Sequence, residues 1–333
     1  MQRTISQTPL RISLFGGSTD YPDYYLRRQG ATLGMTIDKY IYVGLSPISP
    51  FFDHKIRISY SKIELVNSVD EIQHPSIKAC LKYKNIDLPM DIHIIADLPA
   101  KTGLGSSSAF TVGFLNSLYA MQGIKISQQR LAEEACYIEQ NVIQERVGSQ
   151  DQFHAAFGGF NVFQFDASRM NARSIIISRS KKTILDNQLL MFYTGQTRFA
   201  NEVLEEQLET TKKLENDTYL TRIYEMVFEA EDIISQSSDG EMLRLLGRLL
   251  DEGWNMKKKL SSKISNPVID QYYDAALSSG AYGGKLCGAG GGGFLIFMVP
   301  KDSIEAVRNT LKNLLEVHFF MESQGSTIIY MKD

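Results

Sequence analysis

Hydrophobic and polar residues alternate along several segments of the first hundred residues. In KYIYVGL, Ile41, Val43 and Leu45 point to one side of an extended chain, and Tyr40 and Tyr42 point to the other. A period of two residues is typical of a strand with one buried face. RISLF, IRISYS and MDIHIIA show a similar pattern, so we expect strands to dominate this part of the chain.

Segments with the period of an α-helix follow. Residues 109–121 (AFTVGFLNSLYAM) and 128–143 (QQRLAEEACYIEQNVI) are predicted helices, the second with Ser127 as its N-cap. QLLMFYTG, residues 188–195, is predicted to be a buried strand, and three long amphipathic helices are expected between about residues 200 and 280. The strand FLIFMV, a helix over SIEAVRNTLKNLLEV and the strand STIIYM complete the prediction.

The order of these elements indicates the fold class and two lobes. Strands come first, and helices with a few strands follow, which favours an α+β fold. The composition changes near residue 185. We therefore predict an N-terminal lobe over residues 1–185 and a C-terminal lobe over residues 186–333, in agreement with a length typical of about two domains.

The composition is that of an ordinary globular protein. Of the 333 residues, 43% are hydrophobic and 22% charged, and the net charge is −3, so no overall basic field indicates nucleic acid or an acidic membrane. Cys80, Cys136 and Cys287 lack metal-ligand spacing and are expected to be reduced, buried thiols. With no apolar run long enough for a signal peptide or a membrane span, we expect a soluble cytoplasmic protein.

A junction rich in glycine and serine links a predicted strand to a predicted helix. In PAKTGLGSSSA, Gly103 and Gly105 precede the serines 106–108, and the helix is expected to begin at about Ala109. Helix N-termini bind anions, and serine hydroxyls can hold a phosphate oxygen or a magnesium ion. A plain glycine turn with serine N-caps is the alternative. Three serines exceed what capping needs, so we favour a phosphate site, although Lys101 precedes the glycines, unlike the lysine of a P-loop.

Glu139 lies on the apolar face of the predicted helix 128–143. On a helix of 3.6 residues per turn it falls on the side of Ala132 and Ala135. Glu133 and Glu134 fall outside that face and are expected to be solvated. An unpaired buried carboxylate costs several kcal/mol, so Glu139 must meet a cation, an arginine or a proton. A buried salt bridge and a magnesium ligand beside a phosphate site are the two interpretations.

Asp151 and a second glycine-rich segment are further candidates. Asp151, in VGSQDQFHAAFGG, either caps a short helix that begins at Phe153 or accepts a proton from a substrate hydroxyl. KLCGAGGGGF formally contains G-x-G-x-x-G, but a helix precedes it and a strand follows it. Dinucleotide binding needs the reverse order, so we interpret these glycines as a flat loop against a ligand or another loop.

Three segments, in their order and spacing, resemble the signature motifs of the GHMP kinases. They are PLRISLFGGSTD, PAKTGLGSSSA and KLCGAGGGGF. Within this superfamily, FGGSTDYPDYY, TIDKYIYV, VGSQDQFHAAFGGFN and FYTGQTRFA resemble the D-glycero-D-manno-heptose 7-phosphate kinases, with Ser18 where that branch more often has glycine. The resemblance implies a two-lobed fold, with an N-terminal lobe like ribosomal protein S5 domain 2, a ferredoxin-like C-terminal lobe and ATP in the cleft.

The resemblance also implies roles for individual residues. Ser107 and Glu139 would hold Mg²⁺. Asp151 would act as general base or orient the accepting hydroxyl, and Arg11 would pair with it and stabilise the transferring phosphoryl group. The residues expected to bind ATP are Lys101, Gly103, Leu104, Gly105, Ser106, Ser107 and Ser108. Those expected to bind the substrate are Gly17, Ser18, Thr19, Asp20, Arg198, Gly290 and Gly291.

The implied function is an ATP- and Mg²⁺-dependent kinase that phosphorylates the anomeric (C1) hydroxyl of D-glycero-D-manno-heptose 7-phosphate, for nucleotide-activated heptose and surface glycans. The guanidinium of Arg198 is our candidate for holding the second phosphate of this substrate. A C1 kinase for galactose or fucose and an inactive sugar-sensing relative are the alternatives. We expect a sugar phosphate as partner, no nucleic acid, no membrane, and a monomer or homodimer.

Overall fold

A long pair of antiparallel strands forms the centre of the first lobe. The computed structural model describes residues 2–195 and 200–332, and of residues 200–204 only the backbone. Strand β1 (Arg3–Phe15) pairs with β2 (Gly30–Pro47) along most of its length. Within β2, the side chains at 41, 43 and 45 are buried and those of Tyr40 and Tyr42 are half-buried, which confirms the predicted alternation.

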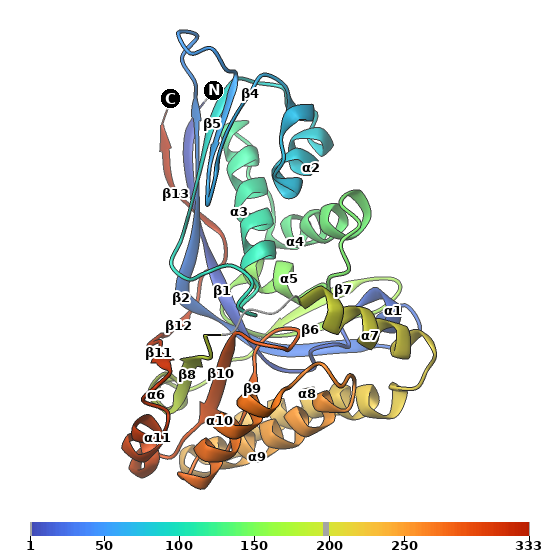
Figure 1. Cartoon of the computed structure of the whole chain (residues 1–333), viewed down its shortest axis with the longest axis vertical. Coiled ribbons are helices and arrows are strands. Elements are labelled where there is room, and N and C mark those ends of the chain that lie inside the picture. Colours follow the sequence, from blue (N-terminus) through green and yellow to red (C-terminus); the bar gives the residue numbers. More distant parts are fainter. Residues whose placement is uncertain (1, 196–199, 333) are drawn as a thin grey trace.

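The last strand of the chain also belongs to this sheet. β13 (Thr327–Lys332) pairs with β1, so the two ends of the chain lie side by side at one end of the molecule (Figure 1). The remaining strands of the nine-stranded sheet are β3 (Ile56–Ser59), β4 (Ile63–Val66), β5 (Met90–Ala96), β6 (Phe160–Phe165), β7 (Met170–Ser174) and β12 (Met321–Glu322).

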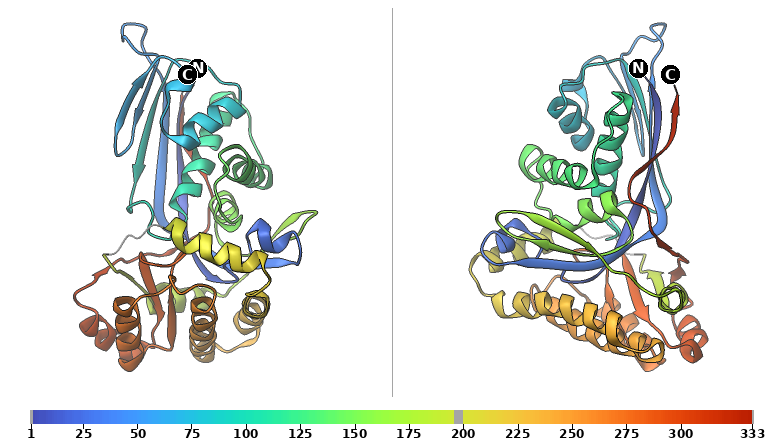
Figure 2. Two further views of the ribbon diagram at one scale, coloured as in Figure 1. Left: turned by 45° about the vertical axis from the view of Figure 1, so that its right-hand side comes forward. Right: turned by 180° about the vertical axis from the view of Figure 1, so that it is seen from behind.

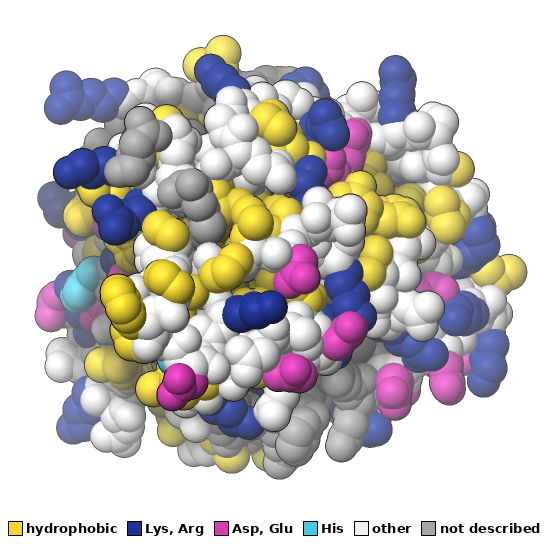
Figure 3. Space-filling view, turned by 90° about the horizontal axis from the view of Figure 1, so that it is seen from above, with side chains coloured by type: hydrophobic (Ala, Val, Ile, Leu, Met, Phe, Trp, Pro, Cys, Tyr) yellow, Lys and Arg dark blue, Asp and Glu magenta, His cyan; other side chains and the backbone are white. Residues whose placement is uncertain are grey.

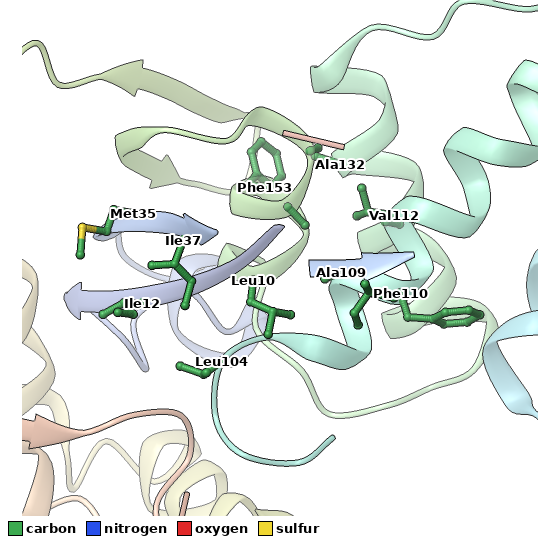
Figure 4. Packing of buried hydrophobic residues seen from close by; sticks show 14 of the residues in the cluster. Leu10, Ile12, Met35, Ile37, Leu104, Ala109, Phe110, Val112, Ala132 and Phe153 are labelled. Atoms are coloured by element: carbon green, nitrogen blue, oxygen red, sulfur yellow. The ribbon is translucent and has the colours of Figure 1, made fainter. Parts of the chain in front are cut away.

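Helices cover one face of this sheet (Figure 2). They are α2 (Pro75–Tyr83), α3 (Ser106–Met121), α4 (Gln128–Tyr137) and α5 (Gln150–Phe157), joined by the short turns η1 (Val69–Glu71) and η2 (Ile138–Val142). The helix α3 runs along β1 and β2, and almost all of its side chains are buried. The core between helices and sheet includes Leu10, Ile12, Met35, Ile37, Ala109, Val112 and Phe153 (Figure 4).

Two local predictions for these helices need correction. α3 begins at Ser106 and not at Ala109, so the serines form its first turn, with Gly105 as N-cap in the left-handed conformation (φ 76°). Glu134 is buried and not solvated, because α4 packs on α3 and the Tyr119 hydroxyl donates to both of its carboxylate oxygens at 2.7 Å. The Ser127 N-cap is confirmed, since its side chain accepts from the Arg130 N–H.

The second lobe is built on a four-stranded antiparallel sheet in the order β11-β8-β10-β9. These strands are β8 (Leu189–Tyr193), β9 (Gly283–Leu286), β10 (Phe294–Met298) and β11 (Leu315–Glu316). The helices that accompany them are α6 (Arg179–Gln188), α8 (Asp217–Gln236), α9 (Asp239–Lys258), α10 (Pro267–Ser278) and α11 (Ile304–Thr310), with the turn η3 (Lys301–Ser303). Two further helices, α1 (Pro22–Tyr25) and α7 (Ala200–Lys212), lie against each other where the lobes meet (Figure 1).

The prediction of three helices between residues 200 and 280 was wrong. The described chain forms four there, because it turns at Leu214, whose φ is 66°, again at residues 237–238, and a third time at residues 259–266. The α+β class itself is confirmed, and the three cysteines are buried and free.

The outer surface agrees with the small net charge. On the end of the molecule that carries both termini, acidic and basic side chains are interspersed (Figure 3). Among the described residues no helix has the length and apolar character needed to cross a bilayer.

Candidate active site

A cavity of about 810 Å³ lies between the lobes and is lined by segments from both. Its lining falls into three groups of side chains. An aromatic and apolar group consists of Ile41, Tyr60, His74, Ile94, Leu98 and Phe110. A loop group consists of Lys101, Gly103, Gly105, Ser106, Ser107 and Ser108, with Arg11 and Asp151 beside it. A polar group consists of Ser13, Gly17, Ser18, Asp20, Gln150, Lys257 and Lys285.

Arg11 and Asp151 form an ion pair at the centre of this lining. The Arg11 Nη2 and Nε atoms lie 2.7 and 2.8 Å from the Asp151 Oδ1 atom. Arg11 also donates through Nη1 to the Gly103 carbonyl at 2.6 Å. The Arg11 side chain is 6% exposed and that of Asp151 26%, so the arginine is fixed from behind while the carboxylate faces the cavity.

Gly105 allows this pair to lie close to the start of α3. A Cβ atom added at Gly105 would come within 3.3 Å of Arg11 Cγ and of Asp151 Cγ. The N–H groups of the first turn of a helix have no partners within the helix, and the three serines that carry them all line the cavity. The loop therefore offers an anion-binding helix end directly beside an arginine and a carboxylate.

Glu139 is buried behind this loop, with 1% of its surface exposed. Its Oε2 atom accepts hydrogen bonds from Ser108 Oγ at 2.8 Å and Gln152 Nε2 at 2.6 Å. Its Oε1 atom makes no hydrogen bond of good geometry, and no ion pair to Glu139 occurs, within residues 2–195 and 200–332. Burial raises the pKa of this carboxyl to about 7, although the neighbouring hydroxyl and amide groups lower it.

Ser107 was predicted to share a magnesium ion with Glu139. The Ser108 hydroxyl contacts the carboxylate directly, and Ser107 is exposed at the cavity. The salt-bridge interpretation of Glu139 finds no cation in the described part of the chain. Ser107 thus directly precedes, in the sequence, the serine that binds Glu139, and its side chain faces the cavity.

Asp20 lies in the turn after β1 and faces the same cavity. It accepts the backbone N–H groups of Ser18 at 3.0 Å and Gln150 at 3.2 Å. Burial and the negative charge of Asp151 raise its pKa to about 6. Ser18 has a φ of 86°, a conformation that favours glycine.

Some predicted residues do not line the cavity. Thr19 is buried, and its hydroxyl donates to the Gly16 and Ala31 carbonyls at 2.8 and 2.9 Å. Leu104 belongs to the hydrophobic core, although its carbonyl accepts the Arg11 N–H at 3.1 Å. Arg198 lies outside the described residues.

The glycine-rich loop after β9 contacts the loop before α3. A Cβ atom at Gly288 would lie 2.4 Å from Gly103 Cα, so the two backbones touch. Gly288 and Ala289 line the cavity. The predicted pair, Gly290 and Gly291, packs instead on Ile264, whose carbonyl accepts the Gly291 N–H at 2.9 Å.

Two buried lysines are the main site residues that the sequence interpretation missed. Lys257 follows Leu250 and Trp254 on the apolar face of α9, and a helical wheel of the kind that singled out Glu139 would have found it. Lys285 lies in the short strand β9, where no periodicity marks it.

The aromatic group was also missed. The His74 ring centroid lies 5.1 Å from that of Tyr60 and 4.9 Å from that of Phe110. Glu64 fixes this group, because it accepts the Tyr60 hydroxyl at 2.9 Å and the His74 N–H at 3.2 Å. These residues come from three separate segments, and only the fold brings them together.

Comparisons with known proteins identify the family. The model of the GHMP kinases N-terminal domain matches residues 73–159, and the model of the GHMP kinases C-terminal domain matches residues 240–317. The D-glycero-alpha-D-manno-heptose 7-phosphate kinase of Campylobacter jejuni is 29% identical over an alignment of 316 positions that covers 90% of each chain. The L-fucokinase/L-fucose-1-P guanylyltransferase of Bacteroides fragilis is 26% identical over 91% of this chain and 35% of its own length.

The fold agrees with this assignment. The crystal structure of a D-glycero-D-manno-heptose 1-phosphate kinase from Bacteroides thetaiotaomicron superposes with a TM-score of 0.77, at 22% identity and with full coverage of both chains. The predicted resemblance is thereby confirmed. The chain belongs to the GHMP kinases and is a carbohydrate kinase, a phosphotransferase that acts on an alcohol group.

Proposed function

We propose that this kinase transfers the γ-phosphoryl group of ATP to the anomeric hydroxyl of D-glycero-D-manno-heptose 7-phosphate. The product would be the 1,7-bisphosphate, a precursor of nucleotide-activated heptose for surface glycans. Similarity to the Campylobacter jejuni enzyme over 90% of both chains supports the choice of sugar. The observation that carries the chemistry is the Arg11–Asp151 ion pair beside the N-terminus of α3.

ATP fits along two of the three lining groups. The aromatic group around Tyr60, His74 and Phe110 offers faces for stacking and apolar surface, which suit adenine. The loop group offers backbone N–H groups, hydroxyls and Lys101 to the phosphates. This arrangement directs the γ-phosphoryl group towards Arg11 and Asp151.

We further propose that Glu139 and Ser107 hold Mg²⁺. The buried Glu139 Oε1 atom accepts no hydrogen bond of good geometry within the described residues, and such an acceptor is stabilised by a cation. Carboxylate and hydroxyl oxygens are ligands that Mg²⁺ accepts together with phosphate oxygens. When bound, the ion would neutralise charge on the phosphates.

Asp151 and Arg11 would carry the transfer itself. The sugar O1 atom attacks the γ-phosphorus, the new P–O1 bond forms, and the bond from phosphorus to the ADP oxygen breaks. The O1 proton passes to Asp151, which the structure leaves open to the cavity. Arg11 holds the carboxylate in place and stabilises the charge of the phosphoryl group.

Coupled ADP release with a panel of acceptors tests this function. The panel contains heptose 7-phosphate, galactose, fucose and mevalonate. We expect turnover of heptose 7-phosphate and a product in which phosphorus NMR shows a new anomeric phosphate. Turnover of only galactose or fucose would overturn the proposed substrate, and saturable sugar binding without any ADP release would identify a sensing protein.

A further inference from the structure

Two lysines of the second lobe belong to the polar group of the cavity and have no part in the chemistry above. Lys257 comes from α9 and Lys285 from β9, and they are 8% and 7% exposed. Neither forms an ion pair within residues 2–195 and 200–332. Two buried ammonium groups without carboxylate partners lower the stability of the folded protein. An anionic ligand that binds both of them would offset this loss.

Backbone carbonyls hold both ammonium groups in place. Lys285 Nζ donates to the carbonyls of Ser13 and Leu14, each at 3.0 Å, and Lys257 Nζ donates to the Gly288 carbonyl. An ammonium group has three N–H donors. One donor of Lys285 and two of Lys257 are thus left over after these contacts.

Lys285 lies beside the segment that leads to Asp20, and the charge of Asp20 acts on both lysines. Ser13 and Leu14, which bind Lys285, lead directly into the turn that carries Asp20. The Ser13 Oγ and Gln150 Oε1 atoms are also buried at this part of the cavity and find no hydrogen-bond partner in the described chain. This part of the lining therefore offers unused polar atoms to a ligand other than the triphosphate.

The charge of this region favours an anion. Arg11 is neutralised by Asp151, and Asp20 is the remaining carboxylate that acts on the lysines. Burial lowers the pKa of Lys257 to about 7 and that of Lys285 to about 8, and the charge of Lys285 contributes to the shift of Lys257. A bound dianion would relieve both effects, whereas neutral sugar hydroxyls would relieve neither.

We propose that Lys257 and Lys285 bind the phosphate group of the acceptor, so that the kinase selects a sugar phosphate over the free sugar. This inference rests on the proposed function, and it names the residues that bind the 7-phosphate of the acceptor sugar. It gives to the two lysines the role that the sequence suggested for Arg198.

The test compares binding with and without the acceptor phosphate. Calorimetry measures the affinity of the wild type, K257M, K285M and the control K259M for heptose 7-phosphate, for the unphosphorylated heptose and for ATP. Lys259 belongs to the same lysine run but is exposed. We expect K257M and K285M to lose about tenfold or more in affinity for heptose 7-phosphate, with unchanged affinity for ATP and for the free heptose.

Several outcomes would overturn the inference. A loss of ATP affinity with unchanged binding of heptose 7-phosphate would assign the lysines to the nucleotide. Equal losses for the two heptoses would show that the lysines only shape the pocket. Because Lys285 also ties β1 to the second lobe, K257M decides the result if K285M does not fold, and unchanged ATP affinity verifies folding.

Failure of the proposed function gives a different pattern. A wild-type enzyme that uses another sugar phosphate, with the same loss in K257M, would disprove heptose 7-phosphate as substrate and retain the lysine site. A wild-type enzyme that uses only free sugars would overturn both proposals.

Discussion

At Asp151, a substitution by asparagine removes the charge of the side chain and keeps its shape. Asparagine keeps the shape but cannot accept a proton. We expect D151N to lower the rate of phosphoryl transfer by roughly 10²–10⁴-fold, with nearly unchanged nucleotide affinity, because the proposed phosphate contacts lie on the loop group. Single-turnover ADP formation and titration with a fluorescent nucleotide measure the two quantities. Wild-type turnover in D151N would remove Asp151 from its proposed role.

The buried carboxylate of Glu139, which we propose to bind Mg²⁺, lowers the stability of the folded protein when it is charged. Its pKa in the folded protein is about 7, above the ordinary 4.5 of glutamate, so its contribution to stability is lost as the pH rises through about 7. We expect E139Q, in the absence of metal, to be more stable than the wild type at about pH 8, by on the order of 2 kcal/mol, and similar to it at about pH 5.

Thermal unfolding at both pH values checks the stability of E139Q. The same variant should need far more Mg²⁺ for ADP release, since it lacks the proposed carboxylate ligand. Equal melting temperatures at about pH 8 would contradict the buried charge. An unaltered magnesium titration would contradict the metal assignment.

At the scale of elements, the two glycine-rich loops touch at the side of the cavity where we propose that the phosphates bind. Gly103 has a φ of 86°, and a Cβ atom there would lie 2.4 Å from the Cys287 carbonyl oxygen. We expect G103A to raise the KM for ATP and to lower the free energy of unfolding by about 1–3 kcal/mol. G240A is the matched control, because no atom lies within 4 Å of its added Cβ. A G103A enzyme that behaves like G240A would show that the loop contact is dispensable.

The segment that carries Glu139 shows what the hydrophobic periodicity of a helix can predict and what it cannot. Its wheel correctly predicted that Glu139 is buried, but it placed Glu134 in solvent because it could not include the Tyr119 hydroxyl of a different helix. The wheel also assumed a continuous α-helix, whereas residues 138–142 form the π-helical turn η2. Such turns are rare and frequently occur at functional sites.

At the scale of the whole molecule, the order of the motifs predicted the family and the fold class, while the composition of the cavity depended on contacts across the chain. Lys285 and Ser13 are 272 positions apart, and no local pattern connects them. The aromatic group likewise combines residues from separate segments. Sequence patterns identified the loop group and the catalytic candidates, because each lies within one continuous motif.

The polar group of the cavity combines residues of both lobes, and the protonation of its two lysines predicts how substrate binding depends on pH. Lys257 and Lys285, with pKa values lowered to about 7 and 8, are faced by Arg11, Asp20 and the Cys287 thiol. A sugar phosphate is a dianion above about pH 6. We expect the KM for heptose 7-phosphate to rise by about tenfold between about pH 7 and 9 as the lysines lose protons, while the KM for ATP changes little. A KM for heptose 7-phosphate that does not change with pH would contradict this prediction. So would a K257M enzyme whose KM rises with pH as steeply as that of the wild type.

The return of the C-terminal segment to the first sheet predicts the effect of truncation. We propose that residues 321–332 belong structurally with the N-terminal lobe of residues 1–185. Asn116 Nδ2 donates to the Ser326 carbonyl at 3.0 Å, and Ser326 N–H donates to the Ala155 carbonyl at 2.8 Å. We expect a chain ending at residue 317 to be insoluble or to melt far below the wild type, whereas removal of residues 332–333 should have little effect. A folded, active 1–317 chain would disprove this.

The same return path also constrains how the lobes can move. The chain leaves the first lobe through α6 and comes back just before β12, and the Met321 N–H donates to Asp186 Oδ1 at 2.9 Å. Beside this contact, β8 and β11 are paired. The two covalent crossings thus run next to each other. We expect any relative movement of the lobes to keep the crossings together, since separating them would break the bond between Met321 and Asp186.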